Sequence, residues 1–202
     1  MKIFTKTLVR KLIAATILTI TVMTSFAAHN YKNFNTPITG INKIWVSGNV
    51  KIVLTQGDVE AISMADQYDF EYTSVHSKGQ TLYINSSESQ QVTISITVKD
   101  LQRIEASGGS SIVTTGNFDI KYLQIFLSQC ATAKVKATTV SLYTVISDDA
   151  VLKMSGTSDE HFLIADNMSN AKLRNFVSLR TESRVSGALA MNINNVNADL
   201  PK

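Results

Sequence analysis

Four segments decide the fold, because they align with one another: 104-IEASGGSSIVT-114, 125-IFLSQCATAKV-135, 144-TVISDDAVLKM-154 and 163-LIADNMSNAKL-173. Their fourth residues, Ser107, Ser128, Ser147 and Asp166, follow one another at intervals of 21, 19 and 19 residues. In each segment the first, third, ninth and eleventh positions are mainly apolar. Alternate residues of a strand point to the same face, so each segment predicts two short strands with one buried side.

The same alternation occurs earlier in the chain. Apolar residues occupy every second position of 50–54 and of 92–98, and no long stretch has apolar residues at helical spacing. Prolines lie only near the ends, at Pro37 and Pro201. We therefore predict an all-β fold, a single-stranded parallel β-helix (β-solenoid) with coils of about 19 to 21 residues over 99–202. Residues 30–98 are predicted to form an N-terminal strand layer that caps it, and a β-sandwich is the alternative.

The first 27 residues have the three parts of a secretion signal. Four basic residues lie within positions 1–11, an apolar run follows over 12–23, and the small residues Ser25 and Ala27 precede the expected cleavage point. A transmembrane anchor, the alternative, needs about 20 consecutive apolar residues. We predict a signal peptide over 1–27 and a single exported domain over 28–202 that does not span the membrane.

Removing this leader changes the charge of the protein. The whole chain has 19 basic and 16 acidic residues, and the leader holds four of the bases and none of the acids. The exported part keeps 15 bases and 16 acids, a net charge of −1. Its balance gives no support for nucleic-acid binding. The single cysteine, Cys130, excludes an internal disulfide framework.

Residues that could support catalysis are scattered. His29, His76 and His161 have no Cys, His or acidic residue at metal-ligand spacing. Ser107 lies in Ser-Gly-Gly-Ser, a turn sequence and not the setting of a catalytic serine. Cys130 is expected to be a buried small hydrophobe. We predict no enzyme activity, no cofactor and no metal.

Three acidic residues, Asp148, Asp149 and Asp166, are the one group in the sequence that could support catalysis. Asp148 and Asp149 lie one repeat before Asp166 and Asn167, so the alignment brings them to neighbouring strands. Clustered carboxylates would suit a polysaccharide lyase or a glycosidase, which is the alternative function. The simpler interpretation is that these residues form turns.

Basic residues recur at one position of the repeat. The tenth residues of the four segments are Val113, Lys134, Lys153 and Lys172, and Lys136 and Arg174 lie two residues further on in two of them. The alignment predicts three stacked lysines about 5 Å apart, a stripe that attracts anions. Surface lysines that only maintain solubility are the alternative. Lys134, Lys153 and Lys172 are the candidate ligand-binding residues.

Several segments resemble a bacterial family. In order they are Ile44–Val46, Val50–Gly57, Leu82–Ile84 and Leu101–Ser111. They resemble the head GIN domain family of autotransporter adhesins, over residues 34 to 190. The resemblance implies a right-handed β-helix. The sequence departs from the family where Gln129-Cys130 and Asp148-Asp149 follow the repeat serines, positions at which Gly is more usual.

These observations predict an exported, non-enzymatic β-helix protein. Its expected role is an adhesin-like scaffold that binds a component of the cell envelope, such as an anionic polysaccharide, in the periplasm, at the cell surface or after secretion. A purely structural envelope component is a further alternative. The sequence leaves the oligomeric state open.

Overall fold

A computed structural model describes residues 39–64, 69 and 71–186. The predicted signal peptide, His29 and residues after 186 lie outside the described residues. The described part is all-β, as predicted, with one short 3-10 helix, η1 (Met168–Asn170). Its strands are β1 (Lys43–Gly48), β2 (Val50–Gln56), β3 (Ala61–Met64), β4 (Thr73–Lys78), β5 (Thr81–Ser86), β6 (Val92–Val98), β7 (Arg103–Ala106), β8 (Ser111–Thr115), β9 (Phe118–Leu127), β10 (Thr132–Ile146), β11 (Val151–Ala165) and β12 (Ala171–Val185).

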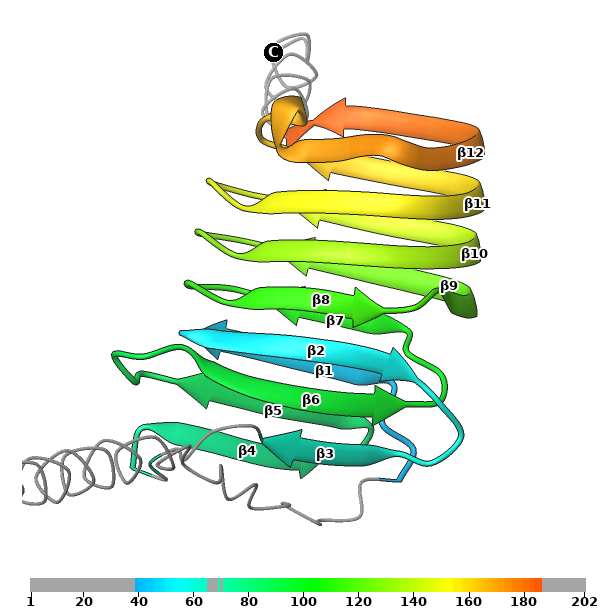
Figure 1. Cartoon of the computed structure of the whole chain (residues 1–202). Helices are drawn as coiled ribbons and strands as arrows, with labels where there is room; N and C mark the ends of the chain where they lie inside the picture. Colours follow the sequence, from blue (N-terminus) through cyan, green and yellow to red (C-terminus); the bar gives the residue numbers. More distant parts are fainter. Residues whose placement is uncertain (1–38, 65–68, 70, 187–202) are drawn as a thin grey trace, which may run out of the picture. The chain divides into compact units, whose positions relative to one another are not determined.

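These strands form one curled, mixed sheet. Its order is β3-β6-β2-β8-β10-β9-β7-β1-β5-β4, with β11 and β12 added beyond β10. The first half of β10 pairs with β8 and the second half with β9, so the sheet turns back on itself within this strand. The result is two facing layers joined through β10, β11 and β12 (Figure 1). We call the layer of β2, β6 and β8 the first layer and that of β1, β5, β7 and β9 the second.

The predicted single-stranded right-handed parallel β-helix is wrong. The sheet is a mixed, curled half-barrel: β3 pairs antiparallel with β6, and β4 pairs antiparallel with β5. Nor do strands follow one another in sequence order, because β2 lies between β6 and β8 and β1 lies between β5 and β7. Partners of β1 and β2 are therefore far away in the chain, where a local repeat gives no information.

The residue alignment behind that prediction does identify neighbours. Ile104 pairs with Ile125, Ile125 with Thr144, and Thr144 with Leu163. Ile112, Ala133, Leu152 and Ala171 form a second such column. Pairing of strands one repeat apart is parallel, and the apolar columns face inward between the two layers, where most of their members are buried.

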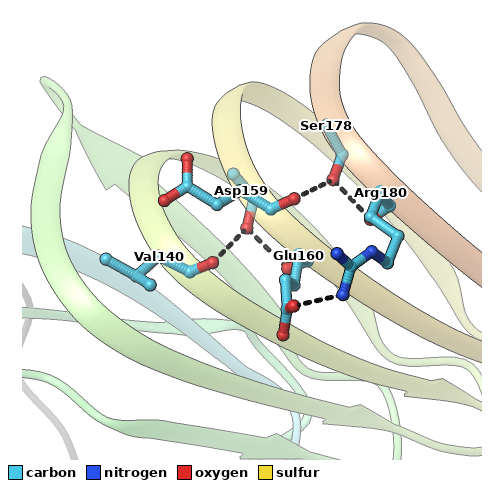
Figure 2. Close-up of polar contacts among 6 residues, drawn as sticks. Val140, Asp159, Glu160, Ser178 and Arg180 are labelled. Atoms are coloured by element: carbon cyan, nitrogen blue, oxygen red, sulfur yellow. Dashed lines mark hydrogen bonds and ion pairs between the residues drawn. The ribbon is translucent and has the colours of Figure 1, made fainter.

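Hydroxyl groups complete the backbone hydrogen bonding where the long strands bend. The strand pairing is interrupted at Val140 of β10 and at Asp159 of β11. These two residues have no partner in the β10–β11 pairing, and Asp159 has none in the β11–β12 pairing either. The Ser158 hydroxyl reaches the carbonyls of Val140 and Glu160 at 3.4 and 2.6 Å, and the Ser178 hydroxyl reaches those of Asp159 and Arg180 at 3.5 and 2.8 Å (Figure 2). Each serine thus supports a bend that an unpaired carbonyl would destabilise.

Candidate functional site

The three candidate lysines stand side by side on the first-layer face of the long strands. Lys134 on β10 pairs with Lys153 on β11, which pairs with Lys172 on β12. All three are exposed, whereas Ala133 and Val135 on either side of Lys134 are buried. Adjacent strands lie about 4.8 Å apart, so the backbones hold three positive charges at close spacing.

A hollow in the surface is lined by the three lysines and by one more basic residue, Arg174. It has a volume of about 240 Å³. The residues that line it are Lys134, Lys153, Met154, Ser155, Lys172, Arg174 and Asn175. We call Lys134, Lys153, Lys172 and Arg174 the basic cluster. No acidic residue lines this hollow, and in the described residues no ion pair involves any member of the cluster.

The local backbone explains how Arg174 joins the cluster. Pairing between β11 and β12 shifts after Lys153, since Ser155 pairs with Asn175 and one additional residue lies in β12. Such a bulge re-aims side chains near it. Lys136, in contrast, pairs with Ser155 and does not line the hollow. The sequence predicted both residues as flanks, and the structure brings only Arg174 to the hollow.

A second, more apolar hollow adjoins the cluster. Its volume is about 350 Å³. Val113, Val151 and Ala133 line it together with Lys134 and Lys153, so two of the lysines border both hollows. Val113 pairs with Lys134 and with Val53, which continues the outward column onto the first layer. Lys134 and Lys153 therefore lie at the boundary between the cationic hollow and the more apolar one.

The carboxylates of Asp148 and Asp166 serve as turn acceptors. Asp166 accepts a hydrogen bond from the backbone N–H of Asp148 at 2.8 Å, and Asp148 accepts one from that of Gln129 at 2.9 Å. Gln129 in turn accepts from the N–H of Gly108 at 2.6 Å. Gly108, Gln129 and Asp148 all have positive φ, so these turns are equivalent. The side chains of Asp148 and Asp166 accept hydrogen bonds from the N–H groups of Gln129 and Asp148, which helps to offset the strain that a non-glycine residue has at positive φ.

This arrangement favours the turn interpretation of the acidic group. Asp148, Asp149 and Asp166 are all exposed. Among the described residues no three His, Cys, Asp or Glu side chains are grouped so that they could hold a metal ion. The hydrogen bond from the Ser186 hydroxyl, and then that from Asp148, lower the pKa of the Asp166 carboxyl.

Asp166→Asn is expected to reduce stability at neutral pH and to have no effect in acid. The ionised carboxylate is favoured in the folded state, so its contribution is present above the ordinary pKa and is lost as pH falls through the lowered pKa. Because the group is exposed, the effect is small. Urea unfolding of both proteins at about pH 7 and about pH 3 measures it. A constant difference between them would contradict the assignment.

The remaining candidates for chemistry lie apart. His76 is exposed and stacks on Tyr83 with ring centroids 5.3 Å apart, whereas His161 is buried. Cys130 is exposed, so the expectation of a buried cysteine is wrong. The reason is its place in the turn after Gln129, where the chain leaves the core.

Comparison with known proteins identifies the family. The family model described as "putative auto-transporter adhesin, head GIN domain" matches residues 40–199. The chain belongs to this family. The resemblance noted in the sequence of this head GIN chain is thereby confirmed. None of the curated proteins compared with it matches.

Solved structures share the head GIN fold at low identity. A "putative adhesin" from Bacteroides fragilis is 17% identical with a TM-score of 0.64, over 74% of this chain and 73% of its own. A "putative lipid binding protein" from Parabacteroides distasonis is 12% identical with a TM-score of 0.55, over 74% and 76%. A "putative adhesin" from the same species is 13% identical with a TM-score of 0.53, over 74% and 76%. At these identities the likeness concerns the fold.

Within the described residues of the head GIN chain, no helix is both long and apolar enough to cross a bilayer.

Proposed function

We propose that this head GIN protein is an exported, non-enzymatic binding scaffold of the cell envelope, and that its basic cluster binds an anionic polysaccharide. The observation that carries the proposal is the alignment of Lys134, Lys153 and Lys172 on three paired strands with no acidic neighbour in the hollow. Membership of an adhesin family and the structural likeness to described adhesins support a binding role.

The spacing of the cluster suits a repeating polyanion. Like charges directly opposite one another on adjacent strands repel and are destabilising. Anionic groups placed between the lysines relieve that repulsion. The paired strands fix the backbones that carry the lysines, so less backbone entropy is lost on binding than with a flexible basic segment.

The test replaces the three lysines together. Lys134→Gln/Lys153→Gln/Lys172→Gln is expected to weaken retention on immobilised polygalacturonate about tenfold at low salt, because the contact is electrostatic. The matched control is Lys78→Gln/Lys99→Gln/Lys121→Gln, which removes three exposed lysines outside the cluster and leaves the same net charge. We expect the control to bind like the unaltered protein.

Two results would contradict the proposal. Equal loss in both triple variants would show that net charge alone matters, and unchanged retention in the first would exclude the cluster.

An anionic lipid is the other ligand to compare, because one structural relative is described as lipid binding and an apolar hollow adjoins the lysines. Cluster-dependent binding to phosphatidylglycerol vesicles without binding to polygalacturonate would reject the polysaccharide.

A further inference from the structure

Aromatic side chains line the outward face of the second layer and of β4, whereas the basic cluster lies on the outward face of the first layer. On β4, β5 and β1 the His76 and Tyr83 rings stack, and Tyr83 lies 6.1 Å from Trp45 between ring centroids. On the long strands Phe126, Tyr143 and Phe162 follow at 5.8 and 5.4 Å. All of these rings except the exposed His76 are half-buried, on a face that a solvated sheet would cover with polar groups.

This aromatic row is interrupted at β7. In the register Trp45 pairs with Glu105, and Glu105 pairs with Phe126, so a carboxylate stands where the next ring would be. The guanidinium of Arg103 lies 4.1 Å from the centroid of Phe126 and donates to Glu105 Oε2 from both Nε, at 3.2 Å, and Nη2, at 2.7 Å. The gap in the aromatic row therefore has Trp45 on one side and the hydrogen-bonded Arg103–Glu105 pair on the other.

A hollow of about 210 Å³ occupies the interruption. Lys43, Trp45, Thr81, Tyr83, Arg103 and Glu105 line it, and we call it the ring pocket. It is smaller than the roughly 300–1,000 Å³ of sites for drug-sized molecules, so it suits one ring with its substituents. Its polar groups include both acceptors and donors, with the hydroxyls of Thr81 and Tyr83 able to act as either.

We propose that the ring pocket binds a single pyranose unit of a glycan. A pyranose has an apolar face of C–H groups, which packs on an aromatic ring, and a rim of hydroxyls that both donate and accept hydrogen bonds. Trp45 and Tyr83 supply the aromatic surface, and Glu105 and Arg103 supply an acceptor and a donor already held in place. The Arg103–Glu105 pair neutralises its own charge and leaves Lys43 as the one remaining cation of the lining, so the pocket is less cationic than the basic cluster, which has four basic side chains.

The pocket carries its own spectroscopic reporter, because Trp45 is the only tryptophan of the chain. The purified full-length protein is titrated separately with glucose, galactose, mannose and N-acetylglucosamine while its tryptophan emission is recorded. We expect a saturable change for at least one of them, with a Kd in the millimolar range. Glu105→Gln is expected to weaken that affinity about tenfold, since it removes one charge-assisted hydrogen bond.

Two further variants complete the test: one allows for a failure to fold, and the other separates the ring pocket from the basic cluster. Tyr83→Phe removes only a hydroxyl and serves if Glu105→Gln fails to fold; we expect it to weaken affinity at least about threefold. The triple glutamine variant of the basic cluster should bind the sugar normally, so this result is independent of the proposed function. No saturable change with any of the four sugars would overturn the proposal, as would unaltered affinity in both ring-pocket variants.

Discussion

Replacing Gly156 by alanine is expected to lower the free energy of unfolding by about 3 kcal/mol or more. Gly156 lies within β11 with φ of +107°, and it pairs with Ala137 of β10. A Cβ atom at this position would lie 2.0 Å from the Ala137 carbonyl oxygen and 2.9 Å from its carbonyl carbon. Those atoms belong to backbone that is fixed by the parallel ladder, so relief of the clash must displace one strand from the other.

Gly116→Ala is the matched control for this prediction. Gly116 also has positive φ, +77°, but nothing lies within 4 Å of the Cβ that alanine would add. It should cost only the left-handed backbone penalty, about 1–2 kcal/mol. Urea unfolding of the two variants measures the difference. Equal losses would mean that backbone conformation, and not the close approach of β10 and β11, makes Gly156 necessary.

The sequence predicted what depends on near neighbours in the chain. Lys134, Lys153 and Lys172 pair as the repeat alignment placed them, because parallel strands one repeat apart keep their register. The same alignment could not place Ile52, which pairs with Ile94 on one side and Ile112 on the other. Nothing local in the sequence distinguishes those partners from other apolar residues, so the mixed sheet was not predicted.

The basic cluster and the ring pocket also depend on features of the structure that a pattern of residues in the sequence does not reveal. The repeat pattern named Arg174 and Lys136 alike as flanks. A bulge brings only Arg174 to the cluster, and the one additional residue in β12 leaves little trace in a sequence whose repeats already vary in length. The ring pocket depends on Trp45, Tyr83 and Arg103, which come from three separate segments. Only the strand order β7-β1-β5 brings them together. Because the predicted fold class was wrong, the pocket was not predicted from the sequence.

Stability is expected to fall as the pH is lowered through the ordinary titration range of histidine, because of His161. This side chain is 2% exposed, and burial lowers its pKa. Its Nε2 lies 3.3 Å from the Thr144 hydroxyl, and Nδ1 is buried with no hydrogen-bond partner among the described residues. Its ring meets the edge of Phe176 at 5.1 Å between centroids. These contacts favour a neutral imidazole.

The direction of the effect follows from proton uptake. Below about pH 6.5 the unfolded chain binds a proton at this histidine and the folded protein does not, so the free energy of unfolding decreases until the lowered pKa is reached. Above the ordinary pKa the contribution is complete. His161→Gln removes the titration while keeping a polar group that can bond Thr144, so its stability should change less between pH values of about 8 and 5.

Urea unfolding of the two proteins at both pH values tests this expectation, because every other titrating group is common to them and cancels in the comparison. We expect the unaltered protein to lose more stability than His161→Gln on acidification. Equal loss would assign the acid sensitivity to groups outside the core and would mean that the imidazole is not held neutral by burial.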